Sequence, residues 1–472
     1  MNRNLSTQGL ATKCTGMAKF NLACVLLLMV ACTPKVQLRT ADLAISCHNK
    51  QEACSESYIE RYPEHDLAFI EFTEGGNLYN RQHSQQVLKF IDAQAQQENG
   101  VAVFVFVHGW QHTASYKDSN VKQFREFLSR AAENEVVGRR KVIGLYLGWQ
   151  GKTNNVPGLK QLTYWSRKSV AEEVGAGGAT EVFARLHQIL IRQFADQPSD
   201  GPLYKNTYVI VGHSFGGAIV LSALHDVLLN DLIQANTSLE EGPNPCENVN
   251  RYADGIILLN PAIEANKAIL LKEAASRCLF DKSQPTLMHV LSSDGDQATQ
   301  FYFPLGQVVN PASTVRPKIL ERTIMGKTLR LDERLLGITT IGNIGQLRTG
   351  YLSFNKEQKE FVFDRCSDGL EKCRLKTKKQ KNNHIQTDRH DPLSFIKTDN
   401  YFIKNHNDVF GCYTQSYITT IIFQTQATDK GYQDKNKSGA TNQTIEGCDH
   451  LDFDFKRCFN RQLDDYDCEL PE

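Results

Sequence analysis

The chain has 472 residues, of which 41% are hydrophobic and 22% are charged. This length exceeds one minimal domain of ~100–200 residues, and the composition is that of a globular protein with a sizeable core. Wholesale disorder, a collagen-like repeat and a multi-span membrane protein are thereby excluded. Lys plus Arg and Asp plus Glu each total 53, so the net charge is zero. Binding to nucleic acid through bulk positive charge is therefore disfavoured.

The start of the chain has a pattern typical of an export signal. Residues 20–31 are apolar apart from one asparagine, and Lys13 and Lys19 precede them. Twelve residues are too few to span a bilayer as a helix, which needs ~20, but they match the apolar region of a signal peptide. The stretch runs into Leu-Met-Val-Ala-Cys at 28–32, which resembles a bacterial lipoprotein signal, with methionine at 29 where such signals usually have leucine.

This resemblance implies that residues 1–31 are a signal peptide removed before Cys32, which then carries the lipid anchor. Thr33 after the cysteine implies the outer membrane in a host that has two membranes. We therefore expect an exported lipoprotein of the cell envelope, facing the periplasm or the cell surface, with the polar residues 32–65 as a tether. An ordinary signal peptide or a buried strand are the alternatives, and Met17 is a second candidate start.

Cysteine usage agrees with export. Of thirteen cysteines, ten remain when the two in the signal and Cys32 are set aside, and an even number in an oxidising compartment suggests up to five disulfides. Connectivity does not follow from sequence, so proximity alone suggests the pairs Cys47–Cys54, Cys246–Cys278, Cys366–Cys373, Cys412–Cys448 and Cys458–Cys468. Cys-x-x-Cys does not occur, which disfavours a zinc site or a redox dithiol.

From residue 66 onward, short apolar runs alternate with amphipathic helical patterns. The runs predict strands at 67–72, 101–107, 141–147, 208–211, 255–259 and 287–291. The helical spacing predicts helices at 82–97, 120–132, 180–194 and 216–229. Continuous apolar strands alternating with helices indicate an α/β fold, with a mostly parallel central sheet covered by helices on both faces.

This rhythm breaks after residue 300. The stretch 301–389 is poorly periodic and contains a basic run at 372–381, which we interpret as a solvated loop, with an anionic or lipid-headgroup contact as the alternative. Alternation resumes at 393–396, and 413–423 predicts a closing helix. We therefore expect a core domain over 66–425, a lid or insertion over 301–392, and a Cys-bearing C-terminal extension over 426–472.

The strongest chemical signal is Gly-His-Ser-Phe-Gly at 212–216, between an apolar strand and an apolar helix. A serine on such a strand-to-helix turn projects above the sheet as a nucleophile, and glycines flank it because side chains there would collide. The following helix points its N-terminus at the site, which favours developing negative charge. The context predicts that Ser214 is the nucleophile of a serine hydrolase; a glycine-rich packing turn is the alternative.

The second signal is His-Gly-Trp-Gln-His at 108–112, directly after the strand at 101–107. Acyl transfer needs two N–H donors aimed at the tetrahedral oxyanion. We expect these donors to be the backbone N–H groups of Trp110 and Phe215. His108 and His112 could suggest a metal site, but no third ligand stands nearby, so we interpret them as structural.

These two motifs resemble the α/β-hydrolase superfamily, and more narrowly its bacterial esterase and lipase-like members. Further matching pieces are Phe-Ile-Glu-Phe at 69–72, Tyr-Leu-Gly-Trp at 146–149 and Asn-Pro-Ala-Ile-Glu-Ala at 260–265. The resemblance covers roughly residues 66–425. It implies the α/β-hydrolase fold and a triad in the chain order serine, acid, histidine.

The acid is expected after the strand at 287–291, where Asp294-Gly-Asp296-Gln-Ala-Thr follows. Asp296 aligns with the family's acid; Asp294 is the competitor and Glu264 a further alternative. His406, in Lys-Asn-His-Asn-Asp at 404–408, looks like the family's histidine segment, with asparagine where the family has glycine, a residue that tolerates the left-handed backbone.

Other histidines fit the role of base less well. His384 and His390 adjoin the basic run and are interpreted as loop residues, and His213 as structural. His406 would take the Ser214 proton and Asp296 would fix its tautomer. An ordinary imidazole titrates near ~6.5, so we expect activity to be lost in acid.

The expected function is a serine hydrolase that cleaves carboxylic esters, of lipid or other acyl type, without a cofactor. Its partners would be a small-molecule or lipid ester and, through the anchor, a membrane, but not nucleic acid. A catalytically inactive surface lipoprotein that keeps the fold for binding, and an acyltransferase, remain open alternatives, because fold does not fix function and the acyl-enzyme is common to both reactions.

Overall fold

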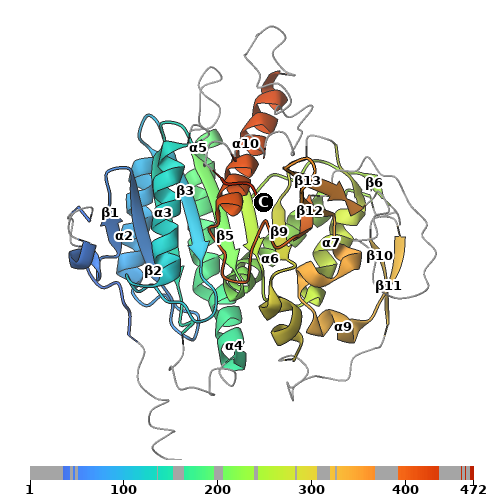
Figure 1. Ribbon diagram of the computed structural model, residues 1–472. Helices are drawn as coiled ribbons and strands as arrows, with labels where there is room; N and C mark the ends of the chain where they lie inside the picture. The colour runs from blue at the N-terminus through green and yellow to red at the C-terminus, as the bar shows by residue number, and fades with distance from the viewer. Residues whose placement is uncertain are drawn as a thin grey trace, which may run out of the picture.

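A computed structural model describes residues 36–42, 46–47, 51–134, 137–152, 164–195, 206–238, 243–281, 284–305, 319–324, 327–366, 392–434, 459, 463 and 468–471. A ten-stranded sheet runs through the middle of the molecule (Figure 1). In spatial order its strands are β1 (Ile59–Arg61), β2 (His65–Glu71), β4 (Lys141–Gly148), β3 (Val101–Val107), β5 (Thr207–His213), β7 (Gly255–Leu259), β9 (Met288–Ser293), β14 (Leu393–Thr398), β12 (Gly350–Asn355) and β13 (Glu360–Arg365).

All neighbouring strands from β2 to β12 are parallel, and only the outermost pairs, β1 with β2 and β13 with β12, are antiparallel. The parallel strands therefore all end at one edge of the sheet, which we call the carboxyl edge. Loops that follow these strands bring residues far apart in sequence together there. The expected α/β class with a mostly parallel central sheet is confirmed.

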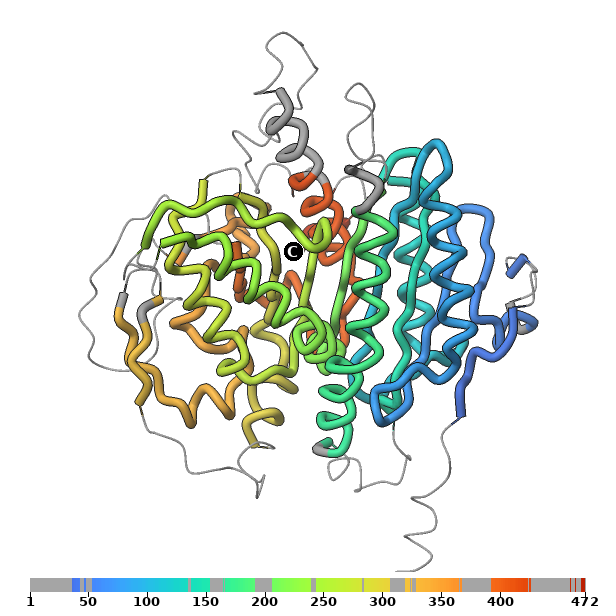
Figure 2. The backbone as a smooth tube through the Cα atoms, turned by 180° about the vertical axis from the view of Figure 1, so that it is seen from behind, coloured from blue at the N-terminus to red at the C-terminus, as the bar shows by residue number. Residues whose placement is uncertain are grey.

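Helices cover both faces of the sheet. Strand β3 shows why: all seven of its residues are buried and apolar, and they alternate between two core clusters, one on each face. The face seen in Figure 2 is covered by α2 (Arg81–Ala95), α4 (Tyr164–Val174), α5 (Thr180–Ala195), α6 (Phe215–Ala235) and α7 (Ile269–Ser276). The opposite face is covered by α3 (Ser119–Glu133) and α10 (Cys412–Asp434).

Helix α6 begins at the carboxyl edge and carries twelve buried residues. Among the described helices it is the one long and apolar enough to cross a membrane by composition, but more than half of its apolar window is buried inside the protein. Its hydrophobicity is thus explained by its place in the core.

The expected tether over 32–65 is wrong for its described part. Strand β1 pairs with β2, and the Arg39 side chain is fully buried. Its guanidinium donates to the Ala114 carbonyl at 2.8 Å and forms an ion pair with Glu60 at 2.8 Å. A buried charge needs such partners, so a polar segment that looked like a linker is in fact integrated into the domain.

The expected lid over 301–392 is also wrong in part. Of its described residues, β12 and β13 form an antiparallel hairpin that extends the central sheet beyond β14. A second hairpin, β10 (Leu320–Ile324) with β11 (Lys327–Leu331), and the short helix α9 (Glu333–Ile338) pack beside α7 and the loops after β7. The basic run at 372–381 lies outside the described residues.

Two of the expected disulfides, Cys47–Cys54 and Cys246–Cys278, are confirmed. The second joins the residue that follows β6 (Asn244–Pro245) to the first residue of β8 (Cys278–Leu279), and these two short strands pair in parallel. The pairs Cys412–Cys448 and Cys458–Cys468 are wrong, because Cys412 bonds to Cys468. That bond joins the start of α10 to a cysteine 56 residues further along the chain. Proximity in sequence could not reveal this partner of Cys412. Cys366 is disulfide-bonded, and its expected partner Cys373 lies outside the described residues.

Candidate active site

Ser214 occupies the sharp turn between β5 and α6, with φ 55° and ψ −119°. This is a strained conformation for a residue with a side chain, and it holds the hydroxyl above the carboxyl edge. A Cβ on Gly216 would lie 2.0 Å from the Val107 carbonyl oxygen, and one on Gly212 would lie 2.8 Å from the Gly217 Cα. The flanking glycines are therefore required by close backbone packing around the serine.

Three side chains from distant parts of the sequence meet at Ser214. The Ser214 hydroxyl lies 2.9 Å from Nε2 of His406, and Nδ1 of His406 lies 2.9 Å from Oδ1 of Asp296. Asp296 is fully buried, and Ser214 is 3% exposed. Ser214 follows β5, Asp296 follows β9 and His406 follows β14, so the parallel sheet brings all three to its carboxyl edge.

Asp296 is held ionised in a dry environment. Burial alone would raise the pKa of its carboxyl group, but the hydrogen bond and charge attraction of His406, with two hydrogen bonds from Thr299, lower that pKa overall. Thr299 donates from its backbone N–H to Oδ1 at 3.1 Å and from its hydroxyl to Oδ2. Because Oδ1 accepts from His406, the imidazole carries its proton on Nδ1 and presents Nε2 to the serine.

The two other candidate acids lie elsewhere. Asp294 accepts from the Tyr351 hydroxyl at 2.6 Å and pairs with the Lys397 ammonium at 3.3 Å, with its side chain half exposed. Glu264 forms an ion pair with Lys168. Neither carboxylate bonds to His406 in the described structure, so Asp296 is the acid placed for that role.

The side chain of His213 supports the loop that carries His406. Nε2 of His213 donates to the His406 carbonyl oxygen at 2.7 Å, and the two rings lie 4.9 Å apart. Burial, followed by repulsion from His406 and His112, holds the pKa of His213 well below its ordinary value, so this ring stays neutral beside His406. His213 was expected to be structural, and the structure shows which loop it supports.

Asn405 does not have the left-handed backbone that the sequence suggested, since it is not among the described residues with positive φ. Its side-chain oxygen instead accepts from the Asn407 N–H at 2.9 Å, closing a turn. The left-handed asparagine nearby is Asn260, after β7, with φ 43°. Its side-chain nitrogen donates to the Asn405 carbonyl at 3.4 Å, and its side-chain oxygen accepts from the Ser293 N–H at 2.9 Å. Asn260 therefore links the ends of β7 and β9 to the loop that carries His406.

A network of buried polar side chains lies next to Asp296. The Lys397 ammonium on β14, 3% exposed, donates to the Asn343 side chain at 2.8 Å and to the Ser293 carbonyl at 3.0 Å. The Asn343 amide in turn lies 3.4 Å from the Thr299 hydroxyl. Burial lowers the pKa of Lys397, while the attraction of Asp294 opposes that shift. The network thus runs from a buried ammonium to the Asp296 carboxylate.

On the other side of Ser214 lies the loop after β3. A Cβ on Gly109 would come within 2.9 Å of the Ser214 Cβ, so the backbone preceding Trp110 abuts Ser214. Phe215 is the first residue of α6, where a backbone N–H has no acceptor within the helix. Both residues expected as oxyanion donors therefore stand next to Ser214.

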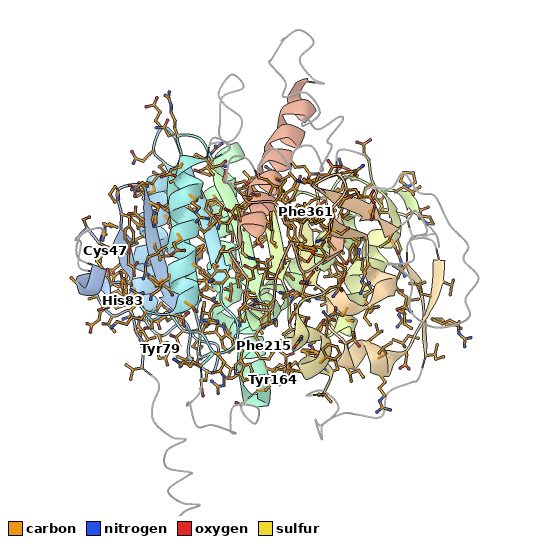
Figure 3. All side chains as sticks on the ribbon, in the orientation of Figure 1. Cys47, Tyr79, His83, Tyr164, Phe215 and Phe361 are labelled. Carbon is orange, nitrogen blue, oxygen red and sulfur yellow. A yellow bond between two sulfur atoms is a disulfide. The ribbon has the colours of Figure 1, made fainter. Side chains whose placement is uncertain are left out.

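Aromatic rings flank this side of the site. The Tyr164 ring lies 5.0 Å from Phe215, 5.8 Å from Trp110 and 6.4 Å from Phe303, between ring centres. Figure 3 shows Phe215 and Tyr164 next to each other toward the lower edge of the molecule. Phe215 and Phe303 are buried, so these rings form an apolar wall packed against the loop after β3 and the start of α6.

His108 and His112 are engaged by the protein itself. His108 donates from Nδ1 to the Gly109 carbonyl at 2.9 Å and accepts at Nε2 from the Trp149 N–H at 3.1 Å. Burial lowers the pKa of His108 to about 4. His112 pairs with Asp118 at 2.9 Å. No group of three or more His, Cys, Asp or Glu side chains in the described part of the chain is arranged to hold a metal ion.

Sequence reasoning missed the supporting residues Thr299, Asn343, Lys397 and Asn260. A lysine in a short strand that also holds leucine, phenylalanine and isoleucine, and an Asn-Pro directly after a strand, were readable signals for two of them. Asn343 had no such signal in the sequence, because it belongs to a stretch without clear periodicity. Cys32, His384 and His390 lie outside the described residues. Comparison with protein-family profiles, with curated proteins and with solved structures found no match.

Proposed function

We propose that this protein is a serine hydrolase of the α/β-hydrolase superfamily that cleaves carboxylic esters of lipid or other acyl type. The observation that carries the proposal is the continuous chain from the Ser214 hydroxyl through the His406 imidazole to the buried Asp296 carboxylate, with both contacts at 2.9 Å. A strained serine, a histidine within hydrogen-bond distance of it, and a buried carboxylate that orients the histidine are the requirements for acyl transfer.

The geometry supports a two-step reaction. His406 Nε2 takes the hydroxyl proton as the Ser214 oxygen attacks the ester carbonyl, and the tetrahedral oxyanion would accept from the N–H groups of Trp110 and Phe215. His406 then gives the proton to the departing alcohol, which leaves an acyl-serine. A water molecule, deprotonated by the same imidazole, hydrolyses that ester, releases the acid and restores Ser214. Each oxyanion donor contributes on the order of 10²–10³ in rate.

The proposal also includes export and anchoring. The signal-like residues 1–31 and the lipidation of Cys32 suggest a lipoprotein of the cell envelope, at the outer membrane in a host that has one. Disulfide formation in the described chain supports an oxidising compartment.

Labelling with a fluorophosphonate probe tests the catalytic part. The mature chain should be labelled, and Ser214→Ala and His406→Ala should abolish labelling while they melt at temperatures close to that of the parent protein. Absence of labelling in the oxidised, folded parent protein would reject the hydrolase and favour an inactive binding lipoprotein. Product analysis with an added alcohol distinguishes an acyltransferase, which would form the new ester in preference to the free acid.

A further inference from the structure

The described chain begins at the same edge of the sheet as the candidate active site. The backbone N–H groups of Leu38 and Arg39 donate to the Glu71 carboxylate at 3.0 and 2.8 Å. Glu71 is the last residue of β2, whose carboxyl end lies beside those of β4, β3 and β5. Three strand spacings separate β2 from β5, or roughly 15 Å. Figures 1 and 2 both show the blue start of the described chain at the lower edge, on the side of α4.

This start is fixed in place. The Arg39 side chain is fully buried, and its Nε donates to the Ala114 carbonyl, in the loop after β3, at 2.8 Å. Only three residues separate Cys32 from Val36. Four peptide steps span at most ~14 Å, so the Cα atom of Cys32 can lie no farther than that from the Cα atom of Val36, which is two residues before the contact with Glu71. An anchor at this position would hold the edge that carries Ser214 close to the bilayer.

Exposed apolar side chains gather on this edge. Phe301, Tyr302 and Leu305 follow Asp296 in the chain and are 62%, 68% and 63% exposed. Phe303 between them is buried and faces the aromatic wall of the site. Single exposed apolar residues are ordinary on protein surfaces, but three within five residues beside a candidate active site form a patch. Val36, near the anchor point, is exposed to 68% as well.

We propose that the carboxyl edge docks on a lipid bilayer through Phe301, Tyr302 and Leu305, and that the ester substrate is an acyl lipid of that bilayer. This inference rests on the proposed function and on anchoring at Cys32. A bilayer is the partner that these observations favour, because the first described residues of the chain and the exposed apolar patch lie at the same edge of the sheet. Phenyl and phenol rings suit the membrane–water interface, and stable attachment through a lipid chain takes a second contact.

The experiment uses the mature chain with Cys32→Ser, so that the patch acts without the lipid, and phosphatidylcholine vesicles as the probe. The parent chain should co-sediment with the vesicles and hydrolyse their acyl esters. F301S/Y302S/L305S should lower vesicle binding and lipid hydrolysis about tenfold or more. The matched control V227S/I233S changes exposed apolar residues of α6, and Ile233 lies about 28 Å along that helix from Ser214. It should bind and hydrolyse vesicles like the parent.

Turnover of a soluble butyrate ester separates the two proposals. A parent chain that turns over butyrate but does not bind vesicles, or a triple variant that binds them as well as the parent, overturns the docking surface and leaves the hydrolase standing. If the folded parent protein neither turns over butyrate nor is labelled by the probe, the proposed function itself is rejected. A dimer that dissociates in the triple variant would show that a second copy covers the patch, and would also overturn the proposal.

Orientation is tested by Phe301→Trp and Ile233→Trp, which place an indole at two positions of similar exposure, 62% and 58%. Brominated phosphatidylcholine should quench the added fluorescence of Phe301→Trp and leave that of Ile233→Trp unchanged. Equal quenching at both positions, or none at residue 301 in vesicle-bound protein, contradicts docking through the carboxyl edge.

Discussion

The strands on the Ser214 side of the sheet and those on the Asp296 side differ in what surrounds them. Strand β3 and most of β5 are buried among apolar side chains, and backbone geometry at flanking glycines positions the serine. Strands β9 and β14 instead bury His289, Ser293, Lys397 and Thr398. There the acid and the histidine are positioned by side-chain hydrogen bonds, since buried polar groups must be satisfied.

The candidate site is thus held in two different ways. The serine side depends on apolar packing and a tight turn, which is a local property of the sequence. The acid side depends on a polar network drawn from three separate segments, the loop after β9, the segment containing Asn343, and β14.

Asp296→Asn should lower kcat/KM for a soluble ester on the order of 10³–10⁴, because an amide cannot hold the productive tautomer of His406 or stabilise its charged form. Asp294→Asn is the matched control, since that carboxylate bonds to Tyr351 and Lys397 and not to His406. Its activity should stay within about tenfold of the parent. Equal losses in both variants would contradict the assignment of the acid.

Removing the disulfide between Cys412 and Cys468 with paired serines should lower the free energy of unfolding by about 4 kcal/mol, because the bond closes a long loop in the unfolded chain. Removing Cys47–Cys54, with a separation of seven residues, should cost about 2 kcal/mol. Urea unfolding measures both. If removing Cys47–Cys54 lowered the free energy of unfolding more than removing Cys412–Cys468, local packing around the short loop would matter more than loop length.

Acid should destabilise the fold through histidines that are buried neutral. Burial lowers the pKa of His65 to about 4, and that of His108 likewise. Both folded pKa values lie below the unfolded value of ~6.5, so the unfolded chain binds more protons between pH 6.5 and 4. Stability is therefore complete above pH 6.5 and falls as the pH drops through this window.

His65 alone should contribute about 3 kcal/mol to this loss. His65→Gln replaces a ring whose two nitrogens have no hydrogen-bond partner in the structure, and it should flatten the pH dependence of urea unfolding between pH 6.5 and 4. An unchanged slope in this variant would show that the ring is solvated or protonated in the native state.

Thr299→Val removes the hydroxyl bonded to Asp296 and keeps the shape of the side chain. The expected loss in kcat is about 10–100-fold, since a hydrogen bond to a charged group contributes about 1.5–3 kcal/mol, and KM should change little. Thr299→Ser should restore most of the rate. Full activity in the valine variant would mean that the backbone N–H of Thr299 and His406 suffice to position the acid.

Much of the fold could be predicted from the sequence. The apolar run Val101–Val107 is a strand over those same residues, and the Gly-His-Ser-Phe-Gly motif forms the turn it predicted, because both depend on residues adjacent in the chain. Continuous apolar strands between helical patterns also determine a parallel sheet, since they must be covered on both faces.

The tertiary structure alone decided the rest. Arg39 and Lys397 are polar in sequence and buried in the fold, because partners distant in the chain satisfy their charges. The segments that form β12 and β13 lie in the poorly periodic stretch that we expected to be a lid or insertion, and only their pairing with β14 and with each other shows the sheet they extend. The Cys412–Cys468 bond, and the place of Leu38 and Arg39 at the same edge of the sheet as Ser214, likewise depend on long-range contacts, which a linear pattern does not encode. The sequence already favoured Asp296 as the acid, and the residues that hold its carboxylate came only from the fold.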